Sequence, residues 1–255
     1  MSQQQPPQSQ SQHDDPDSQP MDSQPTSVAM PAAPSWLGGA AGVGFLVTRI
    51  GSSDAKVAAA DAAKLLLAAK DPWLKYSKEK NAYEDVVAVE IPDADNCALV
   101  SLTPARHETD VSRLGTWIME QLSSGADWTK AEGVRPTHVS RMIPVEGTCD
   151  ELDLISLAAN VVPKHLETIR REGLRSATYE VIYEEHKPSL HLLPSVVNAA
   201  IGECLPDGYV VDLKSPSHSV LCLVQGNTCF LSVVHNYRDI AKHFAVHKAL
   251  SAAAA

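Results

Sequence analysis

The side chains of this chain that could carry out a reaction do not form a recognisable catalytic pattern. The sequence contains no P-loop, no GxSxG nucleophile elbow and no HExxH zinc motif. Glu184 and Glu185 are adjacent in a segment with strand periodicity, so their carboxylates should face opposite sides of the strand. They cannot then serve together as a general acid and base. We therefore expect no active site and no cofactor.

The ten histidines and five cysteines have no metal-ligand spacing either. The cysteines form no CxxC pair and are odd in number, which favours small buried hydrophobic residues over a zinc site or a structural disulfide. His243 and His247 lie four residues apart on a possible terminal helix, where surface residues are favoured over a metal pair. The glycine-rich stretch 38–44 precedes a strand, whereas a dinucleotide-binding loop follows one, so we interpret it as a linker.

Cationic side chains remain as candidates, because they can bind a polyanion without any reaction. The formal net charge is −10, so affinity for nucleic acid would have to come from a local patch gathered by folding. The densest basic stretch contains Lys164, Arg170, Arg171 and Arg175. Arg170 and Arg171 have an alternative role, which is to stabilise the carboxyl end of a helix.

Hydrophobic periodicity divides the chain into a tail and two units. Residues 1–38 are rich in Gln, Ser, Pro and Asp and are predicted to be disordered. Residues 42–147 show the order βαββαβ, which is the ferredoxin-like pattern. Its first helix should be capped by Ser52 or Ser53 and stop at Asp71-Pro72. The four predicted strands are 44–50, 85–91, 97–102 and 137–146.

The second unit, residues 148–248, has the predicted order ααβαβββ, and residues 249–255 form a terminal tail. Its first helix carries Leu152 and Ile155, and Pro163 should start a separate helical turn. The predicted strands are 178–185, 209–213, 219–224 and 228–234, with a helix at about 193–201. The fold class is therefore α/β (α+β). No apolar run reaches the roughly 18 residues that a membrane-spanning helix needs, so no membrane contact is expected.

Four segments, taken in order, resemble the THUMP-domain adaptors of tRNA cytidine acetylation. They are RMIPVEGTC (141–149), similar to R-[LM]-[IL]-P-[IV]-x-x-T-C; YEVIYEEHKPS (179–189), in the place of F-x-I-x-Y-K-x-R-N-N; VDLKSP (211–216), similar to V-D-L-x-N-P; and TCFLSVVHNYR (228–238), similar to C-x-L-S-V-V-x-x-Y. GVGFLVTRI (42–50) also resembles the first strand of that family, so the resemblance covers about residues 42–247.

The resemblance implies a ferredoxin-like domain followed by a THUMP domain. It also implies a non-catalytic, monomeric protein of the nucleus or nucleolus, with the cytoplasm as a further location. Its partners would be serine and leucine tRNAs and an RNA cytidine acetyltransferase that makes N4-acetylcytidine. The RNA contacts implied by the matching segments are Arg141, Lys187 and Lys214, to which we add the basic stretch from Lys164 to Arg175.

Some positions depart from the family pattern. Glu184 and His186 stand where the family has cations, Lys187 and Pro188 stand where it has two asparagines, and Ser215 replaces the asparagine of V-D-L-x-N-P. Arg141 has an alternative role as an ion-pair partner that links the two units. The alternative function is a protein-interaction module of THUMP fold with little RNA affinity of its own.

Overall fold

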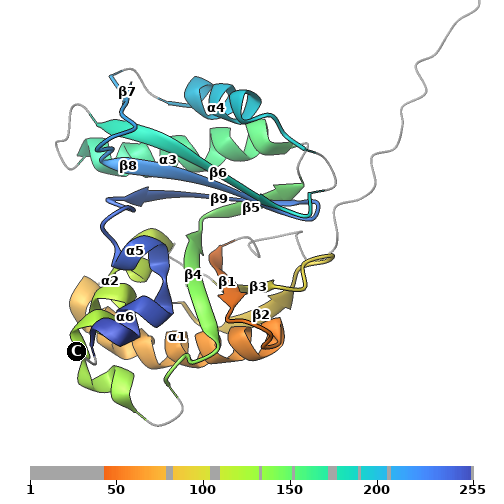
Figure 1. Ribbon diagram of the computed structural model, residues 1–255. Coiled ribbons are helices and arrows are strands. Elements are labelled where there is room, and N and C mark those ends of the chain that lie inside the picture. The colour runs from red at the N-terminus through yellow and green to blue at the C-terminus, as the bar shows by residue number, and fades with distance from the viewer. Residues whose placement is uncertain are drawn as a thin grey trace, which may run out of the picture. The chain divides into compact units, whose positions relative to one another are not determined.

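The computed structural model describes residues 43–78, 83–103, 110–131, 134–150, 153–171, 177–188, 191–205 and 208–253, and for residues 166–171 and 241–242 it describes the backbone alone. The predicted disordered tail, residues 1–38, lies outside the described residues. The predicted fold class is confirmed, since the structure is a mixed α/β arrangement with two separate sheets (Figure 1).

The first sheet has the predicted ferredoxin-like topology. Its strand order is β2-β3-β1-β4, and every neighbouring pair is antiparallel. The elements are β1 (Gly44–Arg49), α1 (Ala55–Ser77), β2 (Val86–Glu90), β3 (Cys97–Leu102), α2 (Val111–Ser124), the 3-10 helix η1 (Asp127–Lys130) and β4 (Val139–Val145). All six residues of β3 are buried, as a continuous apolar run in a central strand requires.

Helix α1 differs from its prediction at both ends. Its N-cap is Asp54, whose side chain accepts a hydrogen bond from the amide of Lys56, rather than Ser52 or Ser53. The helix also continues through Pro72 and ends at Lys78, whose backbone is left-handed. Trp73 follows the proline and is fully buried, so packing of this ring offsets the hydrogen bond that proline removes.

The second sheet has the order β5-β9-β8-β6-β7. Strand β6 runs parallel to both β7 and β8, whereas β8 and β9 form an antiparallel hairpin. The elements are β5 (Gly147–Asp150), α3 (Leu154–Arg171), β6 (Thr178–His186), α4 (Pro194–Glu203), β7 (Val210–Val211), β8 (His218–Gln225) and β9 (Thr228–His235). This unit, which the resemblance assigns to the THUMP fold, therefore exists as a layered α/β sheet.

Three details of the second unit were predicted wrongly. Helix α3 is continuous through Pro163, which lies inside it instead of starting a new turn. Val161 and Val162 are buried against the sheet, and this packing holds the helix together across the proline. Strand β5 was not predicted because four residues are too few to show a period, and β7 is shorter than predicted.

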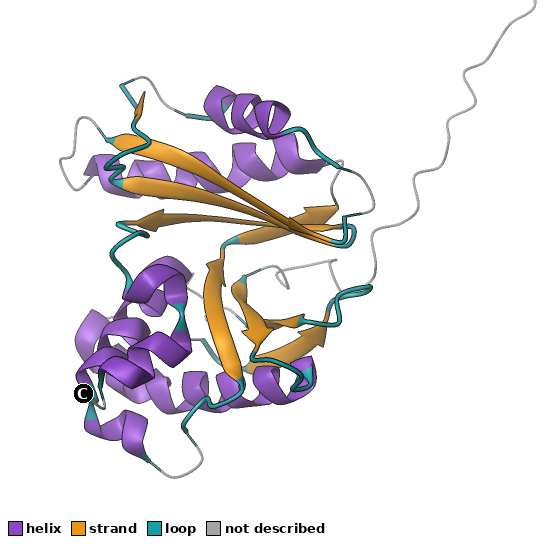
Figure 2. Cartoon of the chain, in the orientation of Figure 1, coloured by secondary structure: helices purple, strands orange, loops and turns teal. Residues whose placement is uncertain are grey.

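The two faces of the second sheet pack against different partners. Helices α3 and α4 lie along one face (Figure 2), where Ala158 and Val162 meet Val220 and Leu231 in one apolar cluster. The opposite face contributes Leu221, Leu223 and Phe230 to the core of the first sheet. Because side chains alternate along a strand, β8 and β9 fill both cores at once.

The C-terminal segment returns to the first sheet. Helices α5 (Ala241–Phe244) and α6 (Val246–Ala252) follow β9, yet Phe244, Val246 and Ala249 are buried in the core of the first sheet. The sequence placed residues up to 248 in the second unit and 249–255 in a tail. The division into two independent domains at about residue 147 stays a prediction.

Gly44 begins β1 at a point where the backbone of β3 leaves no room for a side chain. A Cβ atom at this position would collide with the carbonyl oxygen of Val100.

We predict that Gly44→Ala lowers the free energy of unfolding by about 1–3 kcal/mol, measured by urea denaturation. Gly202→Ala is the control, because its Cβ would meet only the Tyr179 hydroxyl at 4.0 Å. In helix α4 this change should be neutral or stabilising by up to ~1 kcal/mol. Equal effects of the two substitutions would contradict the prediction.

Candidate nucleic-acid interface

The segment VDLKSP forms a hydrogen-bonded loop at the edge of the second sheet where β6 and β8 begin. Asp212 organises its first half, since Oδ1 accepts hydrogen bonds from the amides of Lys214 at 2.8 Å and Ser215 at 3.1 Å. These two backbone hydrogen bonds lower the pKa of the Asp212 carboxyl group, so the carboxylate form is favoured. Asp212 therefore fixes the backbone of the residue that carries the candidate cation.

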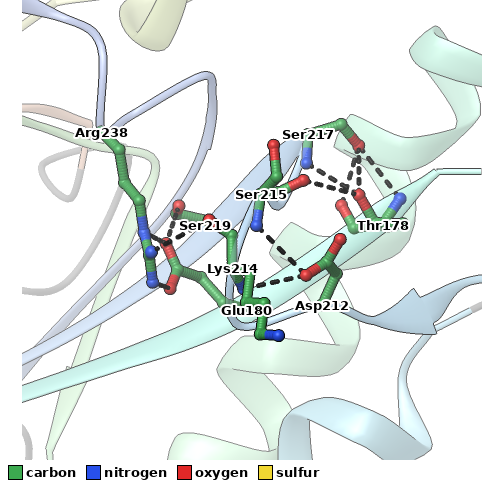
Figure 3. A network of polar contacts seen from close by, with 8 residues as sticks. All are labelled: Thr178, Glu180, Asp212, Lys214, Ser215, Ser217, Ser219 and Arg238. Atoms are coloured by element: carbon green, nitrogen blue, oxygen red, sulfur yellow. Dashed lines mark hydrogen bonds and ion pairs between the residues drawn. The ribbon is translucent and has the colours of Figure 1, made fainter.

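The second half of the loop is tied to the first residue of β6. Ser217 donates from its hydroxyl to the carbonyl oxygen of Thr178 at 2.8 Å, and its amide donates to Thr178 Oγ1 at 2.9 Å. The amide of Thr178 in turn donates to Ser217 Oγ at 3.0 Å. Figure 3 shows these reciprocal contacts. Loop residues 212–217 are thus held at both ends.

A third anchor comes from Arg238, which follows β9. Its Nε donates to Glu180 Oε1 at 2.9 Å, its Nη2 bonds Glu180 Oε2, and its Nη1 donates to the carbonyl oxygen of Lys214 at 3.4 Å (Figure 3). Glu180 is only 3% exposed and also accepts a hydrogen bond from Ser219 Oγ at 2.8 Å. A buried carboxylate needs such partners, because desolvation without them is costly.

Arg238 is the residue that the sequence reasoning missed. It ends the segment TCFLSVVHNYR, and a cation directly after a strand within a matching segment was the signal that could have pointed to it. Its guanidinium bridges the buried Glu180 and the backbone of Lys214. The side chain of Lys214 is exposed, and among the eight residues drawn in Figure 3 no contact is marked from its ammonium group.

The carboxyl end of α3 lies near the start of β6, which is the edge of the sheet that carries the Lys214 loop. Arg170 and Arg171 are in its last turn, and only residues 172–176 separate Arg171 from the start of the segment that enters β6. Such a connection spans at most about 20 Å. The side chains of Arg170 and Arg171 are not described, and Arg175 lies outside the described residues. Lys164 is exposed about two turns earlier on α3.

Arg141 is engaged in a contact between the two sheets. From β4 its Nη1 reaches Glu184 Oε2 on β6 at 2.9 Å, and its Nη2 lies 2.7 Å from the Tyr237 hydroxyl oxygen. Its Nε also donates to the carbonyl oxygen of His243 at 3.4 Å. These contacts support the alternative in which Arg141 is a structural ion-pair partner.

Lys187 lies away from the loop that carries Lys214. It follows the last residue of β6, and its ammonium group pairs at 3.0 Å with Asp95, between β2 and β3. Because Thr178 begins the nine-residue strand β6, about 26 Å separates the two ends. The structure therefore places Lys187 and Lys214 at opposite ends of β6.

Two of the three carboxylates of β6, Glu180 and Glu184, explain how a departure from the family pattern is accommodated. Glu180 and Glu184 are four residues apart on a strand and so share one face. Each is paired with an arginine, Arg238 and Arg141 respectively. The anion that replaces a family cation at position 184 is therefore neutralised within the protein.

Two histidines pair across β8 and β9 at the same edge. The rings of His218 and His235 have centroids 5.0 Å apart, and Ser217 Oγ lies 2.9 Å from His218 Nδ1. His218 is 2% exposed. Burial, with the nearby imidazoles of His235 and His165, lowers the pKa of His218 to about 4.

Within the described residues, no group of three or more His, Cys, Asp and Glu side chains could hold a metal ion. All five cysteines are free thiols, of which Cys97, Cys222 and Cys229 are buried. No helix in the described ranges is long and apolar enough to cross a membrane.

The comparisons with known proteins give low similarity. No protein-family model matches the chain, and no curated protein sequence matches it. Solved structures with a similar chain path include PH1313 from Pyrococcus horikoshii, with 8% identity over 76% of this chain and a TM-score of 0.44. TrmN from Thermus thermophilus has 17% identity over 74% and a TM-score of 0.33. A 4-thiouridine synthetase in complex with RNA and bound ATP has 10% identity over 77% and a TM-score of 0.39.

This chain spans about half the length of those proteins, with coverage of 56%, 44% and 42% of their chains respectively. At these identities and TM-scores the likeness does not by itself assign a family or a function.

The Arg141–Glu184 contact gives a stability prediction. Arg141→Met should lower the free energy of unfolding by about 1 kcal/mol, because the buried Tyr237 hydroxyl loses a partner, whereas the ion pair with the exposed Glu184 contributes little. Lys187→Met is the matched control, since the pair of Lys187 with Asp95 is exposed and should contribute little. Urea denaturation of the two variants compares them directly. If Arg141→Met is as stable as Lys187→Met, the structural role of Arg141 is refuted.

The lowered pKa of His218 predicts a pH-dependent stability. Above pH 6.5 the imidazole is neutral in both states and contributes no slope. Between pH 6.5 and about 4 the unfolded chain binds a proton that the folded chain does not, so the free energy of unfolding decreases as pH falls. The full decrease in the free energy of unfolding is at most about 3 kcal/mol.

His218→Gln should remove this pH dependence of stability in denaturation curves at pH 7 and pH 5, and the exposed-site variant His247→Gln should retain it. An NMR titration that protonates His218 near pH 6.5 would rule out the assignment.

Proposed function

We propose that this chain is a non-catalytic adaptor that binds serine and leucine tRNAs and presents them to an RNA cytidine acetyltransferase, which forms N4-acetylcytidine. The observation that carries the proposal is Lys214. Its side chain is exposed on a loop that is held by hydrogen bonds to Asp212, Thr178 and Arg238. The loop is the VDLKSP segment, one of the four that resemble the acetylation adaptors.

A fixed loop suits recognition of RNA by shape. Proteins that bind double-stranded RNA contact mainly phosphates and 2′-hydroxyls, and these contacts position the RNA without reading base edges. A cation on a preorganised loop loses less conformational entropy on binding than one on a mobile loop. The last turn of α3, which carries Arg170 and Arg171, lies at the same edge and would extend the phosphate contact.

The absence of catalysis is part of the proposal. Asp212 and Glu180, two carboxylates of the hydrogen-bonded network around the Lys214 loop, have structural partners. They support a loop that positions RNA for another protein. In this proposal the chain is a monomer, needs no cofactor, and acts in the nucleus or nucleolus with the acetyltransferase.

A second candidate function is a protein-interaction module with little RNA affinity of its own. The observation in its favour is that Arg141, Lys187 and Arg238 are each paired with a carboxylate, in a chain with a formal net charge of −10. Under this alternative the paired cations do not attract RNA, and tRNA binding is absent even at low salt.

Lys214→Glu tests the site. It should weaken tRNA binding about tenfold or more, and make the dependence of affinity on salt less steep, because one phosphate contact is lost and one repulsion gained. Lys64→Glu is the matched control, since Lys64 is exposed on α1 and carries the same charge change. Fluorescence titration with tRNA at 50 mM and 200 mM salt (about the range over which phosphate contacts are lost) measures both quantities. Equal affinities of the two variants would defeat the site assignment.

The adaptor role needs a functional measurement. The acetyltransferase should acetylate serine and leucine tRNAs faster when the wild-type chain is added, and Lys214→Glu should remove most of this stimulation. Lys64→Glu should stimulate as the wild type does. Tight tRNA binding without any stimulation would refute the adaptor role while leaving RNA binding intact.

A further inference from the structure

A stack of aromatic rings lies at the end of α1, on the helical side of the first sheet. The rings of Trp128 and Trp117 are parallel within 5°, with centroids 5.5 Å apart. Tyr76 stacks on Trp117 at 5.8 Å and 30°. Trp73 is tilted against both Tyr76 and Trp117, at 5.7 Å and 5.5 Å. Four rings from α1, α2 and η1 therefore form one continuous cluster.

The burial of these rings is uneven. Trp73 is fully buried and Trp117 is 4% exposed, so both rings pack in the core of the first sheet and need no ligand to account for them. Tyr76 is 52% exposed, although its neighbour in the stack is a buried tryptophan. It is the one aromatic residue among the exposed large hydrophobic residues of the described ranges. Tyr76 is thus the open end of the stack, and packing alone does not require an aromatic ring there.

Cations lie beside the stack, one against the Trp73 ring and one next to Tyr76 in sequence. The guanidinium carbon of Arg113 lies 5.8 Å from the centre of the Trp73 ring, in a cation–π contact, and the Arg113 side chain is exposed. Lys75 is exposed in the last turn of α1, next to Tyr76 in sequence. An exposed aromatic face with neighbouring cations is the combination by which proteins bind unpaired nucleotides, because bases stack on the ring and phosphates meet the cations.

We propose that Tyr76, supported by Trp117 and Trp73 and accompanied by Arg113, is a stacking site for an unpaired base of RNA. The choice of RNA as the ligand depends on the proposed function. The site itself is separate, because it lies on α1 and α2 of the first sheet, whereas Lys214 lies at the edge of the second. A folded RNA bound through the Lys214 loop would gain a further contact through one single-stranded nucleotide.

Tryptophan fluorescence reports on this site directly. Three of the four tryptophans of the chain are in the stack, and the fourth, Trp36, lies outside the described residues. In a Trp36→Phe background, a ten-nucleotide oligouridylate should quench the fluorescence in a saturable way. Tyr76→Ala should weaken this binding roughly fivefold or more, which corresponds to the loss of one stacked base. Tyr76→Phe keeps the ring and should bind like its parent.

Two further measurements complete the test. Circular dichroism of Tyr76→Ala should match the parent, and its thermal melting should stay cooperative at a somewhat lower temperature, because the ring loses its contacts with Trp73 and Trp117. Arg113→Gln should weaken oligouridylate binding. Its affinity should also depend less steeply on salt concentration than that of the parent, since one cation is removed. Equal oligouridylate affinity for Tyr76→Ala and the parent, or no saturable quenching in the parent, would overturn the stacking site.

Lys214→Glu separates this proposal from the proposed function. It should retain oligouridylate quenching while its affinity for folded tRNA falls. If the parent binds tRNA but is not quenched by oligouridylate, the stacking site fails and the proposed function stands. If oligouridylate quenches saturably through Tyr76 but tRNA does not bind, the stacking site stands and the proposed function fails.

Discussion

Two carboxylates on one face of β6 are each held by an arginine, and only Glu180 is buried, since the side chain of Glu184 is 45% exposed. Glu180 is almost completely buried and is held by Arg238, while Glu184 is held by Arg141. A buried carboxylate such as Glu180 costs several kcal/mol unless it is paired and hydrogen-bonded, whereas the exposed pair of Glu184 with Arg141 contributes less. The two arginines come from different elements, one from β4 of the first sheet and one from the segment after β9. Charge compensation along a single strand thereby fixes how the ends of β4, β6 and β9 meet.

This constraint also decides which cations remain for a ligand. Arg141 and Arg238 are occupied by carboxylates, so in an acidic chain they contribute more to folding than to attraction of a polyanion. Arg238 nevertheless acts on the exposed surface, since its third contact is the backbone of Lys214. The same guanidinium stabilises the buried carboxylate and the loop that presents the lysine. Internal electrostatics and the external binding surface are coupled through one side chain.

Local periodicity was sufficient to predict the order of elements in the first unit, whereas in the second it missed β5 and divided α3 into two helices. The ferredoxin-like unit was recognised because its strands and helices each bury a regular face, and the hairpin of β8 and β9 followed from two apolar runs around Gly226. Pro72 and Pro163 were misjudged because proline was treated as a local stop, whereas buried neighbours such as Trp73 and Val162 keep both helices intact. Tertiary packing outweighed the local preference in both cases.

The candidate site was predictable only in part. Lys214 was found because its segment matched a known pattern, and its exposure agrees with that reading. The contacts that hold it were not predictable, since Arg238 and Glu180 are 58 residues apart in sequence. The aromatic stack escaped notice for the same reason, because Tyr76, Trp117 and Trp128 come from three separate elements. Spacing along the chain cannot show pairs that only the tertiary fold brings together.

The return of α5 and α6 to the first sheet has a consequence for synthesis. Phe244 is fully buried in a core whose other members were made about 100 to 200 residues earlier, such as Phe45 and Leu114. While the chain is on the ribosome, the first sheet can form its strand pairs but cannot close this part of its core. Folding of the N-terminal half is then completed only after helices α5 and α6 have been translated, which leaves an apolar surface open to chaperones in the meantime.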